Sequence, residues 1–326
     1  MSRNRALGGV FATFVAAATV LVGAGAQQFG AGQPPGPQKP VGVGQVPSPL
    51  PLANPIREHG SSVTPAFEGW YNDKDGSVRL LVGYLNRNTK QEFDIPVGPN
   101  NRIEPGDPDQ GQPTHFLPNR QWGVFTIKVP KDLGDKKMTW TIVANGFTNT
   151  ITMHTRPEWI VEPYEDAAQK NTPPVFKFAS DGPAFTGPPS TIAAKYTATA
   201  GEPLALTTWV TDEGPKLNIP PPNPGRGRGR GAAGSAGPPV PPVPPLSITW
   251  SMFRGPGAVT FDKNKPTIDR EAGGKATAMA TFSAPGDYIL RVEGNDSSGI
   301  GGGGFQCCWT NVHVAVTVKP GTSTKH

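Results

Sequence analysis

The sequence has 326 residues, and its 41 glycines and 39 prolines together make up about a quarter of it. Such a composition favours turns and extended segments over helix, and it excludes a mainly helical enzyme. Hydrophobic residues make up 36% and charged residues 17%, which excludes a wholly disordered chain and a bundle of membrane helices. The formal net charge of +5 points to no particular class of partner.

The chain begins with the features of a secretory signal peptide, residues 1–26. Arg3 and Arg5 supply the positive start, residues 6–22 are apolar or small, and residues 24–26 read Ala-Gly-Ala, a cleavage motif. An uncleaved membrane anchor is the alternative, but the stretch is only weakly apolar. We therefore predict cleavage and a secreted or periplasmic protein. No transmembrane span is expected afterwards, since no later run reaches the roughly 20 apolar residues that a span needs.

Two segments are rich in proline and glycine and show no hydrophobic period. Residues 27–58 are expected to form a disordered tether, and residues 214–245 an insertion within the second folded region. The insertion carries three arginines on a glycine background, at positions 226, 228 and 230. Three charges are too few to predict a nucleic-acid partner for an exported protein. A solvated loop is the favoured interpretation, with an acidic envelope polymer as the alternative target.

The first folded region, residues 59–158, consists of short strand-like runs separated by turn residues. An Asp-Gly turn at residues 75–76 lies between two apolar runs, and an Asn-Gly pair at 145–146 separates alternating runs at 138–144 and 147–153. Both dipeptides are typical of tight β-hairpins. No segment has a convincing helical period, so we predict a β-sandwich or a small open barrel.

A proline-rich connection, residues 159–190, leads to the second folded region, residues 191–319, and a short tail follows at 320–326. The second region has period-two apolar stripes, which predict antiparallel strands with one buried face and one wet face. These stripes lie at residues 204–210, 248–252, 278–282, 288–292 and 312–318. Their number and spacing match one immunoglobulin-like sandwich. The predicted fold is therefore all-β, with two immunoglobulin-like or β-sandwich domains.

The second region also contains motifs that point to a known family. They are Trp250, Gly-Pro-Gly at 255–257, Thr-Phe at 281–282, Pro-Gly at 285–286, Tyr288, Leu290, Arg291 and Asp296. Together they resemble the PKD-type immunoglobulin-like modules of secreted and cell-surface bacterial proteins. This resemblance implies an immunoglobulin-like fold and no particular activity. Residues 69–76 and 109–120 resemble motifs of an uncharacterised exported bacterial β-domain, which implies no activity either.

The densest polar stretch, residues 98–120, is longer than a hairpin needs and is the best candidate for a ligand-binding surface. The predicted ligand-binding residues in or beside it are Asp107, Asp109, Gln112, His115, Arg120 and Trp122. Trp122 lies on the strand face opposite Phe125 and Ile127, so we expect it to be exposed. A flat aromatic face can stack on the apolar face of a sugar ring. Trp140 and Trp250 are expected to be core residues.

Metal and cofactor signals are weak. Asp73 and Asp75 resemble part of a calcium loop, but the first ligand and the terminal glutamate are missing, so a plain turn is favoured. The histidines are scattered without zinc-ligand spacing, and no nucleophile or phosphate-binding motif is present. We predict no catalytic residues and no cofactor.

Only two cysteines occur, Cys307 and Cys308, and they are adjacent. Neighbouring side chains on a strand point to opposite faces, so the pair does not suit the inter-sheet disulfide of antibody domains. A vicinal disulfide is one interpretation. Two free thiols, or one intermolecular bridge, is the other.

These features predict an exported, non-enzymatic binding or structural module of the bacterial cell envelope or extracellular space. Polysaccharide or envelope proteins are the expected partners. One alternative is a carbohydrate-active enzyme, or its accessory carbohydrate-binding domain, in which Asp107 and Asp109 do acid–base work. Another is a subunit of an envelope protein complex, which would show a contiguous apolar patch.

Overall fold

The computed structural model describes residues 57–130, 136–166, 170–214, 246–296 and 307–321, all within one compact unit. The predicted signal peptide, most of the tether and most of the 214–245 insertion lie outside the described residues. Within those residues the structure is all-β, with the single short helix η1 (Pro157–Trp159). No helix in the described ranges is long and apolar enough to cross a membrane.

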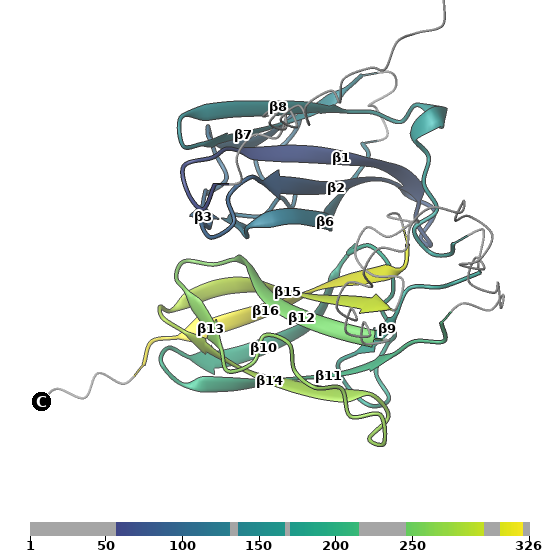
Figure 1. The fold of residues 1–326 in the computed structure, drawn as a ribbon, viewed down its shortest axis with the longest axis vertical. Helices are drawn as coiled ribbons and strands as arrows, with labels where there is room; N and C mark the ends of the chain where they lie inside the picture. Colours follow the sequence, from purple (N-terminus) through teal and green to yellow (C-terminus); the bar gives the residue numbers. More distant parts are fainter. Residues whose placement is uncertain (1–56, 131–135, 167–169, 215–245, 297–306, 322–326) are drawn as a thin grey trace, which may run out of the picture. The chain divides into compact units, whose positions relative to one another are not determined.

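The first region forms two three-stranded antiparallel sheets and a short ribbon (Figure 1). The first sheet is β1 (Val63–Asn72), β2 (Val78–Asn86) and β6 (Asn119–Lys128). The second is β4 (Asn101–Glu104), β7 (Met138–Ala144) and β8 (Phe147–Met153), and the ribbon is β3 (Phe93–Asp94) with β5 (His115–Phe116). Both predicted hairpins are confirmed: Asn72 pairs with Val78, and Ala144 pairs with Phe147. The second turn places Asn145 and Gly146 at φ of 49° and 78°, which this residue pair tolerates.

A hydrophobic core fills the space between these sheets. Its largest members include Tyr84, Phe116, Phe125 and Trp140, all at most 1% exposed. The predicted burial of Trp140 is thus confirmed. Its indole N–H donates to the Asn101 side chain at 3.0 Å, so the ring is buried without an unsatisfied donor.

The second region is a sandwich of two four-stranded sheets. One sheet has the order β10 (Ile192–Thr199), β16 (Trp309–Lys319), β15 (Gly286–Asp296), β12 (Leu246–Arg254). The other has the order β13 (Val259–Phe261), β14 (Lys275–Phe282), β11 (Pro203–Thr211), β9 (Val175–Lys177). The sequence stripes form the core between them, and Trp250 is 1% exposed, as predicted. Strand β9 comes from the proline-rich connection and pairs with β11, and β10 pairs parallel to β16. The period-two stripes predicted neither of these pairings.

One local feature marks this sandwich as immunoglobulin-like. The Tyr288 hydroxyl, at the start of β15, donates to the carbonyl of Ala284 four residues upstream at 2.8 Å. This arrangement is the tyrosine corner of immunoglobulin-like folds.

The prediction that the second face of each strand is wet is wrong for β12, β15 and β16. Five of the buried side chains on that face are Phe253, Arg291, Glu293, Asn311 and His313, all at most 9% exposed. Phe253 joins the core of the first region. Residues of the first region cover this outer face and supply hydrogen-bond partners, so its polar side chains can be buried. A period-two stripe predicts only which side chains face the core of their own sheet and cannot show that the other face is covered.

The contact between the two sandwiches centres on Gly123 of β6. Its φ is +51°, and the indole of Trp309 lies where a Cβ would stand. Asn311, two residues along β16, donates through Nδ2 to the carbonyls of Trp122 at 3.0 Å and Gly123 at 3.1 Å. The Gly123 N–H donates to the Glu68 carboxylate at 2.8 Å. A glycine is therefore required here for both conformation and space.

His313 continues the same contact. Its Nε2 lies 3.0 Å from the Val124 carbonyl, and its ring centroid lies 4.2 Å from that of Phe253. Burial is the main cause that lowers the pKa of His313 to about 3, and the nearby Arg291 and Arg254 lower it further. The imidazole is therefore buried in its neutral form.

Acid should weaken the fold through His313. Below pH 6.5 the His313 side chain binds a proton in the unfolded chain, whereas in the folded protein it stays neutral down to about pH 3. The contribution of neutral His313 to the free energy of unfolding is therefore complete above pH 6.5 and is lost as the pH falls toward 3. Between pH 7 and 5 the free energy of unfolding should fall by about 2 kcal/mol more in the natural protein than in His313→Gln. Urea unfolding at each pH measures this difference. Equal pH dependence of the two proteins would refute it.

Gly123→Ala should destabilise the protein by about 3 kcal/mol or more, because the new methyl group strains the positive φ and overlaps the Trp309 ring. Gly146→Ala is the matched control: its φ is +78°, but nothing lies within 4 Å of the added Cβ. The control should lose only about 1 kcal/mol. Chemical denaturation measures both, and equal losses would show that Trp309 does not determine the effect.

Candidate functional site

The polar loop at residues 98–120 uses Gln112 to hold its own backbone. The side chain is completely buried; its Oε1 accepts from the Gln110 N–H at 2.8 Å, and its Nε2 donates to the Pro108 carbonyl at 2.8 Å. Asn101, also completely buried, donates to the carbonyls of Ile95 and Pro113. Gln112 therefore has a structural role and offers no surface to a ligand.

Asp109 forms a salt bridge with Arg254 of the second region. Its two carboxylate oxygens lie 2.8 Å from Nη2 and Nη1 of Arg254, and Arg254 Nε donates to the Gln112 carbonyl at 2.7 Å. The hydrogen bonds from Arg254 lower the pKa of Asp109. The carboxylate stays ionised in this bidentate pair and is not suited to donate a proton. Asp107 is exposed on the same loop. Because Arg254 engages both oxygens of Asp109, the two aspartates are not a free acid–base pair.

His115 lies in the β3–β5 ribbon between two carboxylates. Its Nδ1 is 2.8 Å from Asp94 Oδ1, and its Nε2 is 3.2 Å from Glu92 Oε2. Both ring nitrogens are thus occupied by groups of the protein. Of the six predicted ligand-binding residues, Arg120 and Trp122 line a common pocket.

Arg120 and Trp122 are positioned by a glutamate that the sequence analysis did not identify. Glu68 lies where the register of β1 shifts, and its side chain passes over Gly83 to reach β6. One carboxylate oxygen accepts from Arg120 Nη2 at 2.6 Å and the other from the Gly123 N–H at 2.8 Å. The Arg120 guanidinium in turn lies over the Trp122 ring, 3.9 Å from its centroid. Trp122 is only partly exposed, where the sequence predicted an exposed ring, because this guanidinium covers it.

Burial raises the pKa of Glu68 to about 7, although the Arg120 charge and the Gly123 N–H both act to lower it. The side chain is only 2% exposed. Since both oxygens accept hydrogen bonds from the protein, Glu68 positions Arg120 and β6.

A pocket of about 160 Å³ opens beside this group. It is lined by Phe67, Glu68, Arg120, Trp122, Glu158, Trp159, Ile160 and Val161. Trp159 is 44% exposed and stacks on Phe67, with 5.3 Å between ring centroids and 24° between ring planes. The ring therefore has a fixed orientation and still presents apolar surface to solvent.

The far wall of the pocket belongs to the connection, which docks on β1. The Val161 N–H donates to the Trp70 carbonyl at 2.9 Å, and the Trp70 indole donates to the Arg156 carbonyl at 2.6 Å. No spacing in the sequence links Phe67 with Trp159. The sequence signal that could have indicated this pocket is the pair Trp159 and Ile160 in a proline-rich connection.

Asp73 and Asp75, the weak calcium candidates, serve the β1–β2 turn. Asp73 lies 2.5 Å from Arg79 Nε and accepts from the Tyr164 hydroxyl at 2.6 Å. Asp75 accepts from the Ser77 N–H at 2.8 Å. Among the described residues, no three His, Cys, Asp or Glu side chains are grouped as a metal site. These contacts fit the turn interpretation.

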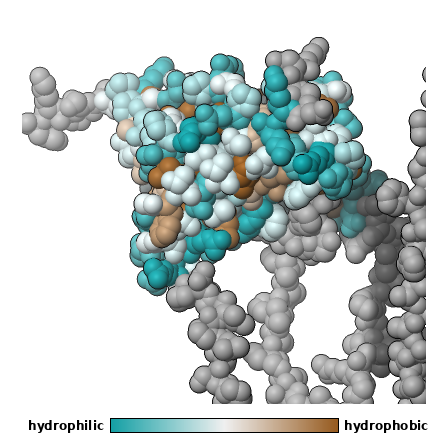
Figure 2. Space-filling view, turned by 90° about the horizontal axis from the view of Figure 1, so that it is seen from above, coloured by the Kyte–Doolittle hydropathy of each residue, from teal (hydrophilic) through white to brown (hydrophobic). Residues whose placement is uncertain are grey.

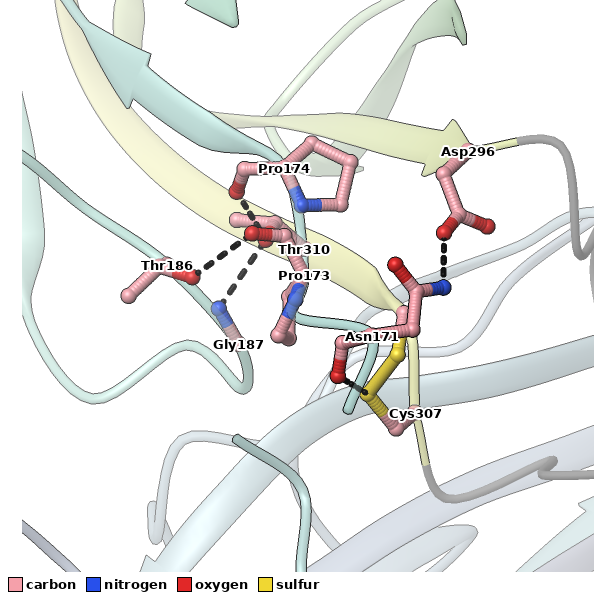
Figure 3. Close-up of a disulfide and its surroundings, with 9 residues drawn as sticks. Asn171, Pro173, Pro174, Thr186, Gly187, Asp296, Cys307 and Thr310 are labelled. Atoms are coloured by element: carbon pink, nitrogen blue, oxygen red, sulfur yellow. Dashed lines mark hydrogen bonds between the residues drawn. A yellow bond between two sulfur atoms is a disulfide. The ribbon is translucent and has the colours of Figure 1, made fainter. Parts of the chain in front are cut away.

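The adjacent cysteines lie just before β16 (Figure 3). Cys307 and Cys308 are joined by a disulfide, with 2.00 Å between the sulfur atoms, and both are buried. The Cys307 sulfur lies 3.8 Å from the Asn171 carbonyl oxygen, and the Asn171 amide donates to the Asp296 carboxylate, as Figure 3 shows. Thr310 accepts from the Gly187 N–H at 2.9 Å. The disulfide therefore packs where the connection meets the ends of β15 and β16.

Intact-mass spectrometry under denaturing conditions tests the vicinal disulfide. We expect the natural protein to be a monomer lighter by two hydrogens than its reduced form, and to react with a thiol-alkylating reagent only after reduction, because both sulfurs are bonded to each other. Cys307→Ser/Cys308→Ser is the unreactive control. Alkylation without reductant, or a disulfide-linked dimer, would show that the pair is free or intermolecular.

No protein-family model and no curated protein matches the sequence. Solved structures with some similarity include the S-layer protein rSbsC, at 11% identity and a TM-score of 0.21; the match covers 79% of this chain and only 28% of the S-layer chain. The D00-D0 domain of intimin is 10% identical, with a TM-score of 0.23 and coverage of 78% and 100%. A tandem pair of titin immunoglobulin domains is 9% identical, with a TM-score of 0.20 and coverage of 80% and 100%.

Proposed function

We propose that this protein is an exported, non-enzymatic binding module of the cell envelope or extracellular space. We further propose that it holds a sugar ring against Trp159. The exposed Trp159 ring, fixed on Phe67 at the mouth of the pocket, is the observation that carries this proposal.

The pocket combines the two chemical features that bind a pyranose. The Trp159 face offers a flat apolar surface for the C–H groups of the ring. Arg120 Nη1 donates to the carbonyls of Tyr84 and Gln121 and Nη2 donates to Glu68, which leaves the Nε–H and one Nη2–H for sugar hydroxyls. Glu158, which is exposed beside Trp159, supplies carboxylate acceptors. A few polar groups around an apolar surface are typical of a small-molecule site. The volume of about 160 Å³ suits a single ring better than a long chain enclosed on all sides.

The same geometry disfavours a glycosidase. That chemistry uses two carboxyl groups that both reach the scissile bond, one of them able to donate a proton. Glu68 is closed off beneath Arg120, and both of its oxygens already accept hydrogen bonds. Glu158 would act alone. Binding without bond cleavage is therefore the better supported function.

A role as a buried subunit of an envelope complex has less support. Figure 2 shows small apolar areas scattered among hydrophilic residues on the face that it presents, instead of one contiguous patch. The exposed large hydrophobic residues among those described are Phe147, Trp159, Ile160 and Ile192. Only two of them are neighbours in sequence, and they belong to the pocket.

We also propose that the second sandwich is a PKD-type module and that the protein is exported and binds polysaccharide. The immunoglobulin-like sandwich with its tyrosine corner supports a PKD-type module, and the motifs around Trp250 and Tyr288 are the specific evidence for that type. Export rests on the signal peptide of residues 1–26, and the polysaccharide partner rests on the pocket.

Screening the purified protein on an array of neutral and acidic oligosaccharides, followed by calorimetric titration of the best neutral ligand, tests the sugar site. Trp159→Ala should weaken binding at least about tenfold, because it removes the stacking surface. Ile192→Ala removes a similarly exposed apolar side chain outside the pocket and should leave the affinity unchanged. No binding of any neutral sugar, or equal losses in the two variants, would refute the site.

A further inference from the structure

A second and larger groove, the arginine groove, lies on the first sandwich between the starts of β1, β6 and β8 and the end of β2. Its volume is about 710 Å³. Its lining includes Arg57, Arg87, Ser62, Thr89, Asn119 and Phe147. None of these residues lines the Trp159 pocket, so the groove is a separate surface.

The groove carries two positive charges that the protein does not neutralise. Arg57 and Arg87 are exposed, and in the described part of the chain neither forms an ion pair with a carboxylate. The contact of Arg87 Nε with the Thr64 hydroxyl is long, at 3.5 Å. The neighbouring acid, Glu58, is already paired with Lys90 at 2.8 Å. Two guanidinium groups are therefore available for anions, and their planar form suits carboxylates.

The backbone around these charges is held by buried amides. Asn88, completely buried, accepts from the Ser61 N–H at 2.7 Å and donates to the Ser61 carbonyl at 2.9 Å. Its amide also donates to Asn86 Oδ1 at 2.8 Å. The Thr89 N–H donates to the Arg57 carbonyl at 3.0 Å. Because these bonds fix the backbone beneath the arginines, little ordering is needed when a ligand binds.

The groove also has an apolar wall and free hydroxyl groups. Phe147, the first residue after the β7–β8 turn, is 53% exposed, which is unusual for a large aromatic side chain on a stable hairpin. The hydroxyls of Ser62 and Thr89 have no hydrogen-bond partner within the described ranges. Guanidinium groups, hydroxyls and one exposed ring together match a ligand that has carboxylates, hydroxyls and apolar ring faces.

We infer that this groove binds an acidic polysaccharide, a chain of carboxylate-bearing sugar rings. The guanidinium groups of Arg57 and Arg87 bind carboxylates of the chain, and Phe147 packs against the face of a ring. The volume of about 710 Å³ accommodates more than one sugar ring. This site is independent of the neutral-sugar pocket proposed above.

Titration with oligogalacturonate, with neutral dextran oligomers of equal length, and with polyphosphate tests this inference. The natural protein should bind oligogalacturonate more tightly than either other probe. Arg57→Gln/Arg87→Gln should weaken that binding at least about tenfold. Lys263→Gln/Lys265→Gln is the matched control, because it removes two exposed charges far along the sequence and should change the affinity less than twofold. Thermal unfolding should show that all variants remain folded.

Phe147→Ala separates a polysaccharide from a simple polyanion. It should weaken oligogalacturonate several-fold and leave polyphosphate unchanged, because polyphosphate has no ring to pack on the phenyl group. Trp159→Ala should leave oligogalacturonate binding intact, and the double arginine variant should leave neutral-sugar binding intact, so failure of one site is distinguishable from failure of the other. Absence of oligogalacturonate binding, equal loss in the lysine control, or tighter binding of polyphosphate would overturn the inference.

Discussion

The ring of Trp309 seated on the backbone of Gly123 is the contact on which the rest of the structure depends. Gly123 has the conformation and the empty space that only glycine provides, and it lies at an irregularity in β6. Its N–H is bound by Glu68, and its carbonyl accepts from Asn311. One residue therefore connects β1 and β6 of the first sandwich to β16 of the second.

This contact explains why an outer sheet face is both buried and polar. A buried polar side chain is tolerated only when its hydrogen bonds are satisfied, and the irregular backbone of β6 offers carbonyls that a regular strand would have used in its ladder. The carbonyls of Trp122, Gly123 and Val124 serve Asn311 and His313 in this way. Arg254 adds a bidentate pair with Asp109 at another point of the contact. The polar loop that contains Asp109 thus belongs to the scaffold.

The two proposed binding surfaces, the Trp159 pocket and the arginine groove, lie outside the contact between the sandwiches. Glu68 performs a structural task at Gly123 and, through the same carboxylate, holds Arg120 at the edge of the Trp159 pocket. The arginine groove lies on the backbone fixed by Asn88. In each place an exposed aromatic ring lines the same pocket as one or two arginine side chains, which is the arrangement that we propose for binding sugars.

The sequence by itself determined the local elements. The Asn-Gly turn at residues 145–146, the alternating stripes and the burial of Trp140 and Trp250 follow from backbone preferences and a period of two, which act over a few residues. The all-β class and the core of each sandwich could therefore be predicted.

Only the tertiary structure decided which polar residues meet. Arg254 and Asp109 are 145 positions apart, and Phe67 and Trp159 come from a strand and a distant connection. Alternation shows which side chains face the core of their own sheet, but it carries no information about what covers the other face. For that reason the sequence could not show that Asp109 pairs with Arg254, that Gln112 holds the backbone of its own loop, or that a guanidinium covers Trp122. The role of Glu68 at the pocket could not be predicted from the sequence, because its partners Arg120 and Gly123 are brought to it by the packing of three strands.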